Sequence, residues 1–141
     1  MNHQPYNILI VEDNLSHLKL TEYILQRNNV PCALFVVRDG QEALDYLYRK
    51  DAFADAVLYP TPDLILLDLN LPKRDGREVL KILKEDSSLN EIPVVIVSTS
   101  DREEDVTYAL QLGAAAYISK SDGFETVSKE LATVTRYARE K

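Results

Sequence analysis

The sequence LILLDLNLPKRDG, residues 64–76, holds the strongest structural signal of this chain. Its first four residues are aliphatic without interruption, which is typical of a strand that is buried on both faces. The strand then ends at Asp68, and Pro72 and the Asp75-Gly76 pair mark the turn into another element. A carboxylate that closes a buried strand is costly unless a partner satisfies it. Asp68 is therefore the first candidate for a functional residue.

Short apolar runs alternate with amphipathic segments along the rest of the chain. Strand-like runs occur at residues 8–11, 33–37, 94–97 and 115–118 in addition to 64–67. Apolar residues at helical spacing follow each of them, in segments that contain Leu18, Ala43, Val79, Val106 and Phe124. Alternating strands and helices, with strands apolar on both faces, predict a flavodoxin-like α/β fold. We expect a doubly wound (βα)5 unit with a five-stranded parallel sheet in the order 2-1-3-4-5.

Three predicted helices begin with an aspartate that is followed by a glutamate three residues later. In this spacing the N-cap and the third helical residue satisfy each other's backbone amides. The pairs are Asp39 with Glu42, Asp75 with Glu78, and Asp101 with Glu104. Gly113 is expected to end the fourth helix. The stretch 51–62 lacks periodicity and is expected to be an insertion at the rim of the sheet.

The composition describes one soluble globular domain, residues 1–141, with a short N-terminal lead at 1–6. Lys and Arg number 16 against 23 Asp and Glu, and the net charge of −7 argues against nucleic acid as a partner. Neither a signal peptide nor a membrane span is apparent, so a cytoplasmic location without membrane contact is expected. Cys32 is the only cysteine. A single cysteine excludes a disulfide framework, and we expect Cys32 to be a buried thiol without a role.

Acidic residues follow two strands that should be neighbours in the sheet. Glu12 and Asp13 come after the first strand and Asp68 after the third. The carboxyl ends of parallel strands lie at one edge, beside the switch point in strand order, so the three acids should meet. Two such charges at about 4 Å repel by roughly 4 kcal/mol at an effective dielectric constant near 20. Either one carboxyl keeps a proton or a cation lies among them, and oxygen ligands favour Mg²⁺ over Zn²⁺.

The last two strands also end in polar residues. Ser98, Thr99 and Ser100 follow the fourth strand, and Lys120 ends the fifth. A lysine that faces an acid cluster supplies a positive charge for an anion. A dication, an ammonium group, a hydroxyl and a carboxylate are the groups that phosphoryl transfer uses.

The motifs VEDN, LLDLNLPKRDG, VSTS and YISK resemble those of CheY-like response-regulator receiver domains, and the likeness covers nearly the whole chain. The resemblance implies that Asp68 accepts a phosphoryl group from a phosphohistidine. It also implies that Mg²⁺ binds Asp13, Asp68 and the backbone carbonyl of Asn70, while Glu12 acts through water. A receiver of this kind catalyses its own phosphorylation and dephosphorylation and is not a conventional turnover enzyme.

The same resemblance implies a conformational switch at the face of the fourth helix, fifth strand and fifth helix. Ser98 would be the switch hydroxyl, Lys120 would pair with the phosphoryl group, and Tyr117 would turn inward after phosphorylation. Asn70, Thr99 and Ser100 occupy positions that tune how long the phosphoryl group survives. The family usually has proline after the lysine, whereas Ser121 stands here, so the isomer of this peptide bond is left open.

The N-terminal lead, the long stretch before the third strand and the Lys120-Ser121 pair most resemble stand-alone regulators that serve phytochrome-type sensor kinases. The implied partners are a sensor histidine kinase or phosphotransfer protein and a downstream protein target, with no output domain on this chain. Residues 136–141 are expected to end the fifth helix, and their mixed charge could serve a homodimer, a kinase or a target. A solvated helix face is the simpler interpretation of that charge.

Other functions fit the residues less well. A haloacid-dehalogenase-like phosphatase would need a second aspartate two residues after Asp68, where this chain has Asn70. A nucleotide or flavin binder would need a glycine-rich phosphate loop. A protein-interaction module that has lost phosphorylation would not need the acids, hydroxyl and lysine that are present. Taken singly, Asp13 or Asn14 could merely cap the first helix. His3 and His17 are given no role.

Overall fold

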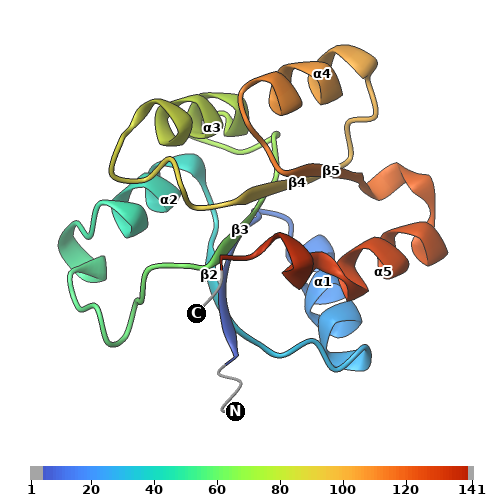
Figure 1. Ribbon diagram of the computed structural model, residues 1–141, viewed down its shortest axis with the longest axis horizontal. Coiled ribbons are helices and arrows are strands. Elements are labelled where there is room, and N and C mark those ends of the chain that lie inside the picture. The colour runs from blue at the N-terminus through green and yellow to red at the C-terminus, as the bar shows by residue number, and fades with distance from the viewer. Residues whose placement is uncertain (1–4, 140–141) are drawn as a thin grey trace.

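Five parallel strands form one sheet in the order β2-β1-β3-β4-β5, as predicted (Figure 1). The computed structural model describes residues 5–139. Each strand begins or ends within two residues of its predicted position. The strands are β1 (Tyr6–Val11), β2 (Cys32–Val37), β3 (Leu64–Leu67), β4 (Val94–Ser98) and β5 (Ala116–Ser119).

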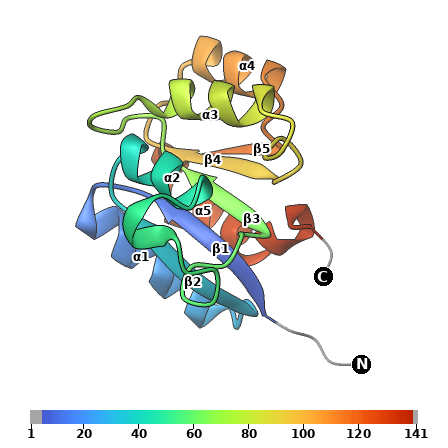
Figure 2. The same cartoon turned by 90° about the vertical axis from the view of Figure 1, so that its left-hand side faces the viewer.

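Helices cover both faces of this sheet (Figures 1 and 2). α1 (Leu15–Arg27) and α5 (Phe124–Ala132) lie on one face, and α2 (Gly40–Leu47), α3 (Gly76–Glu85) and α4 (Glu103–Gln111) lie on the other. Short 3-10 helices occur at Asp51–Phe53, Lys120–Asp122 and Val134–Tyr137. Within residues 5–139, none of the helices has the length and apolarity that crossing a bilayer requires.

Alternate strand residues supply the two cores that hold these layers together. Leu9 and Val11 of β1 point toward the core on the side of α2, α3 and α4. Ile8 and Ile10 point toward the core on the side of α1 and α5. All four side chains are at most 3% exposed. Burial on both faces explains why the strands read as unbroken aliphatic runs rather than as alternating ones.

Two of the three predicted aspartate N-caps are confirmed, but Glu42 accepts from the Arg38 amide and Glu78 pairs with Arg74, so neither glutamate completes the predicted reciprocal pair. The Asp39 carboxylate accepts a hydrogen bond from the Glu42 amide at 2.7 Å, and Asp75 accepts one from the amide of Arg77 at 2.8 Å. The prediction for Asp101 was wrong, because α4 begins one residue later with Arg102 at its N-cap position and without a side-chain cap. Gly113 follows α4 as predicted, in a left-handed conformation with φ of 108°.

The end of the fifth helix and the burial of Cys32 differ from the predictions. The fifth helix ends at Ala132, and a 3-10 turn carries Val134 and the residues as far as Tyr137, so the helix does not continue through residue 136. The stretch 51–62 is held down by edge-to-face contacts of Tyr59 with Tyr46 and with Phe53. Cys32 is half-buried rather than fully buried, and burial raises the pKa of its thiol. His3, Glu140 and Lys141 lie outside the described residues.

Candidate functional site

Asp68 occupies the carboxyl edge of the sheet, directly after β3. Its amide donates to the Val11 carbonyl at 3.1 Å, and its carboxylate accepts from the Asn70 amide at 3.1 Å. The side chain is only 7% exposed. The start of α3 packs against the same backbone, since a Cβ atom at Gly76 would lie 2.1 Å from the Asp68 carbonyl oxygen. Only glycine permits this close approach, which fixes the loop that carries the acid.

Glu12, Asp13 and Asp68 come together at this edge, as the sequence predicts. One carboxylate oxygen from each lies within 4.8 Å of the others. Register explains the meeting, because Val11 pairs with Leu67 and the acids follow those two residues. Glu12 is buried, whereas Asp13 is exposed at the mouth of the site.

The first helix does not use these acids as its cap. Asn14 holds the N-cap position, and its side-chain oxygen accepts from the His17 amide at 3.0 Å. The Glu12 carboxylate accepts from the Asn14 amide at 3.1 Å, and Arg38 donates to the carbonyl of Asp13 at 2.7 Å. Asn14 is therefore the N-cap of α1, and the Asp13 carboxylate lies with those of Glu12 and Asp68 instead.

Lys120 is the cation of the cluster. Its ammonium group hydrogen-bonds to Glu12 and lies 3.6 Å from the nearer Asp68 oxygen, with 12% of the side chain exposed. Burial raises the pKa of the Glu12 carboxyl, and the hydrogen bond and charge of Lys120 act against that rise. Among residues 5–139 no peptide bond is cis, so the Lys120-Ser121 bond is trans.

Ser98 and Ser100 lie at the end of the neighbouring strand, β4. Ser98 is fully buried, and its hydroxyl oxygen accepts from the Ser100 amide at 3.3 Å. Tyr117 on β5 donates its hydroxyl hydrogen to the Ser100 carbonyl at 2.8 Å, and its ring packs against the core on the α3 and α4 side. Burial raises the pKa of this hydroxyl. We call this placement of Tyr117 inward. Thr99 instead lines a cavity of about 240 Å³ between α1 and α5.

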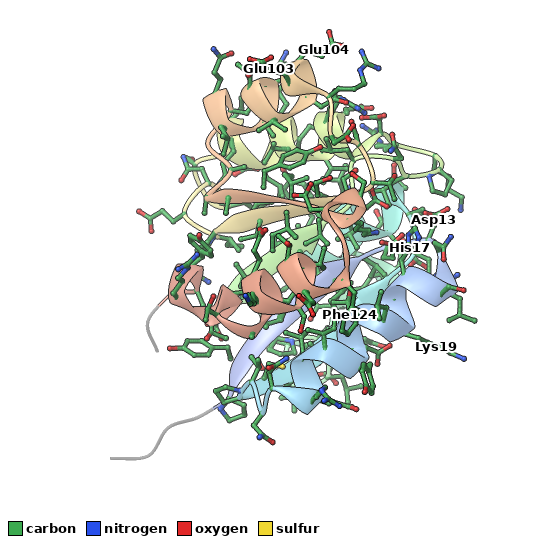
Figure 3. The ribbon with its side chains drawn as sticks, turned by 90° about the vertical axis from the view of Figure 1, so that its right-hand side faces the viewer. Asp13, His17, Lys19, Glu103, Glu104 and Phe124 are labelled. Atoms are coloured by element: carbon green, nitrogen blue, oxygen red, sulfur yellow. The ribbon has the colours of Figure 1, made fainter. Side chains whose placement is uncertain are left out.

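Sequence reasoning missed His17, which lies at the edge of the site (Figure 3). Its Nδ1 atom is 3.2 Å from the Lys120 ammonium and 4.0 Å from a Glu12 oxygen. Burial and the nearby Lys120 charge lower the pKa of this imidazole, which favours its neutral form. The one signal was its position three residues after Asn14, in the first turn of α1, which borders the acid-bearing loop.

The ligand set suits a small hard cation. Three carboxylate oxygens converge, the His17 imidazole lies beside Lys120 and is not part of this convergent set, and Asn70 is exposed beside the acids. Oxygen-only ligation with room for water is the preference of Mg²⁺. The residues present therefore fit Mg²⁺.

Comparisons with known proteins agree with this geometry. Residues 8–132 match the response regulator receiver domain family. Response regulator Rcp1 of Synechocystis sp. is 38% identical over 125 residues, covering 89% of this chain and 83% of that protein. The crystal structure of the phosphorylated cyanobacterial phytochrome response regulator RcpA is 41% identical, with a TM-score of 0.83 over 94% of this chain and 93% of that one.

A Mn²⁺-bound structure of Rcp1 is 36% identical, with a TM-score of 0.83 over 94% of each chain. The match covers all of the sheet except the first two residues of β1, and it covers helices α1 to α5 completely. This chain belongs to the response-regulator receiver-domain family and is a response regulator of two-component signalling.

Proposed function

We propose that Asp68 is the residue that accepts the phosphoryl group. The observation that supports this most is the placement of its buried carboxylate 3.6 Å from Lys120 and within 4.8 Å of Glu12 and Asp13. Asp68 is the acid in this cluster that combines a strand-end position with a lysine and a hydroxyl on the next strands. Glu12 is already committed to Lys120, and Asp13 is the exposed member.

In the proposed step a carboxylate oxygen of Asp68 attacks the phosphorus of a phosphohistidine. A P–O bond forms, the P–N bond breaks, and the imidazole leaves with its electron pair and takes up a proton. Lys120 pairs with the anionic oxygens and neutralises charge that develops on them. Asp13, Asp68 and the Asn70 carbonyl would hold Mg²⁺, with Glu12 acting through water. When bound, Mg²⁺ supplies further positive charge against the phosphoryl oxygens.

Phosphorylation then biases the switch residues. The added oxygens accept a hydrogen bond from Ser98, which must leave the Ser100 amide to reach them. Movement of Ser98 toward the phosphoryl group further favours the inward position that the Tyr117 ring already has in this structure. The consequence is a shift between two conformations of the surface formed by α4, β5 and α5, and a partner protein binds one of these conformations. Asn70, Thr99 and Ser100 tune the lifetime of the aspartyl phosphate in this proposal.

The proposed phosphoryl donor is a sensor histidine kinase of the phytochrome type or its phosphotransfer protein. The similarity to RcpA supports this choice, because RcpA is a cyanobacterial phytochrome response regulator and resembles this chain over most of its length. Comparing the transfer rates from purified phosphorylated kinases tests it. A phytochrome-type kinase should transfer fastest, and faster transfer from an unrelated kinase would contradict the proposal. A homodimer, a downstream protein target and a cytoplasmic location stay predictions.

The site itself is tested with acetyl phosphate and Mg²⁺. Intact-mass measurement should find one acid-labile phosphoryl group per wild-type chain and none on Asp68→Asn. Asp51→Asn is the matched control because Asp51 is an exposed aspartate outside the cluster. Full labelling of Asp68→Asn would contradict the assignment. Continuous release of phosphate at many turnovers per chain would favour a phosphatase instead.

A further inference from the structure

A chain of hydrogen bonds links α3 to α4 and to the loop after β4. The Arg77 guanidinium contacts one oxygen of Asp105, from Nη2 at 2.9 Å and from Nε at 3.1 Å. The other Asp105 oxygen accepts from the Ser100 hydroxyl at 2.5 Å. We call Arg77, Asp105 and Ser100 the Ser100 clasp. Its members come from α3, from α4 and from the loop between β4 and α4.

The clasp differs from an ordinary surface ion pair. Only 10% of the Asp105 side chain and 29% of the Arg77 side chain are exposed. The neighbouring pair of Arg102 and Glu104, in contrast, has 66% and 69% of its side chains exposed. A carboxylate buried to this degree is costly without partners, and both of its oxygens have one. The Ser100 hydroxyl and Arg77 together lower the pKa of Asp105 in spite of its burial.

Ser100 connects this clasp to the switch residues. Its side chain is fixed by Asp105, its carbonyl accepts from the Tyr117 hydroxyl, and its amide donates to Ser98. One residue thus joins the acid of α4 to both groups that respond to phosphorylation. If Asp105 releases the Ser100 side chain, the carbonyl that anchors inward Tyr117 loses its support.

We propose that Asp105 and Arg77 are positioning residues, which hold Ser100 where its backbone carbonyl accepts the hydrogen bond from inward Tyr117. The inference rests on the proposed function of Asp68 and adds two residues to it. If the chain with inward Tyr117 is the form that reacts faster with the phosphodonor, a contact that raises the population of this form also raises the rate of phosphorylation. Loss of the clasp therefore weakens both.

The test compares Asp105→Asn with Glu104→Gln in the full chain. Both changes remove one negative charge from the first turn of α4, but only Asp105 touches Ser100. The first measurement is solution NMR of the Tyr117 ring without phosphodonor. The second is the rate of labelling by acetyl phosphate with Mg²⁺. We expect Asp105→Asn to lose contacts between the Tyr117 ring and the core and to slow labelling at least about threefold. Glu104→Gln should match the wild type in both.

A double-variant cycle separates positioning from general damage. If Asp105 acts through the Ser100 hydroxyl, Asp105→Asn should have no further effect on Tyr117 or on labelling in a Ser100→Ala background. Arg77→Lys keeps the positive charge but lacks the planar guanidinium, so it should show the same change at Tyr117 to a smaller extent. If Asp105→Asn does not fold, Arg77→Lys replaces it in the test.

Unchanged Tyr117 contacts in Asp105→Asn, or in Arg77→Lys where that variant replaces it, would overturn the proposal. Additive effects of Asp105→Asn and Ser100→Ala would do so as well. The NMR measurement needs no phosphorylation, so it reports on the clasp even if wild-type protein fails to label. Failure to label would instead count against the role proposed for Asp68.

Discussion

Replacing Lys120 with methionine removes the ammonium group that hydrogen-bonds to Glu12 and lies near Asp68. The Lys120 nitrogen is 3.6 Å from Asp68, a separation at which opposite charges attract by about 5 kcal/mol at an effective dielectric constant near 20. Dehydration of the buried ammonium offsets part of this attraction. Removing one partner of a buried pair typically costs about 3–5 kcal/mol, because the remaining charges stay buried without compensation. For a chain of this size the melting temperature should fall by roughly 10 °C.

Thermal unfolding followed by circular dichroism, without divalent ions, measures this change. Lys81→Met is the matched control because Lys81 is an exposed lysine of α3, and it should melt close to the wild type. Adding Mg²⁺ should raise the melting temperature of Lys120→Met more than that of the wild type, since a cation then replaces the missing charge. If Lys120→Met were as stable as Lys81→Met, the argument that the acids need this lysine would be wrong.

Three further changes test the packing around the site. Gly76→Ala should lower the free energy of unfolding by about 1–3 kcal/mol in urea titrations, because the new methyl group would overlap the Asp68 carbonyl; unchanged stability would contradict that overlap. The pKa of Asp105 in the folded chain is lower than the ordinary aspartate pKa of 3.8. Its contribution to the free energy of unfolding is therefore complete above pH 3.8 and is lost as the pH falls through the folded-state pKa. The difference in the free energy of unfolding between the wild type and Asp105→Asn should therefore disappear in acid. A difference that does not change with pH would argue against this contribution of Asp105. Tyr46→Phe should cost about 1 kcal/mol through loss of its hydrogen bond to the Pro60 carbonyl without altering phosphorylation, and slower labelling would show that the insertion affects the site.

The sheet and the acid cluster were predictable because both follow from local pattern plus topology. Unbroken aliphatic runs such as Leu64–Leu67 require cover on both faces, and helices between parallel strands provide it. Once the strand order is set, residues that follow adjacent strands meet at one edge whatever their separation in sequence. Glu12, Asp13 and Asp68 meet for this reason, and Lys120 joins them from β5.

The missed features depend on contacts between side chains that no local spacing reveals. Glu104 pairs with Arg102 instead of completing a capping box with Asp101, so the start of α4 differs from the prediction. His17 reaches Lys120 across 103 residues of sequence. Asp105 is buried because Arg77 and Ser100 approach it from two other segments, and an acid in the first turn of a helix gives no hint of such burial.

The end of the fifth helix could not be predicted from apolar spacing either. The apolar spacing of Val127, Leu131 and Val134 fits one continuous helix, and all three side chains are buried. The chain nevertheless tightens into a 3-10 turn after Thr133 and keeps Val134 in the core. Helix ends often take this tighter form, and apolar spacing alone does not distinguish it.

Identifying the residue that carries the phosphoryl group tests the account most directly. Wild-type protein should be labelled with acetyl phosphate and Mg²⁺, reduced with borohydride to trap the aspartyl phosphate, digested and sequenced by mass spectrometry. The account predicts modification at Asp68 alone. Modification at Glu12, at Asp13 or at a residue outside the cluster, with Asp68 unchanged, would contradict it.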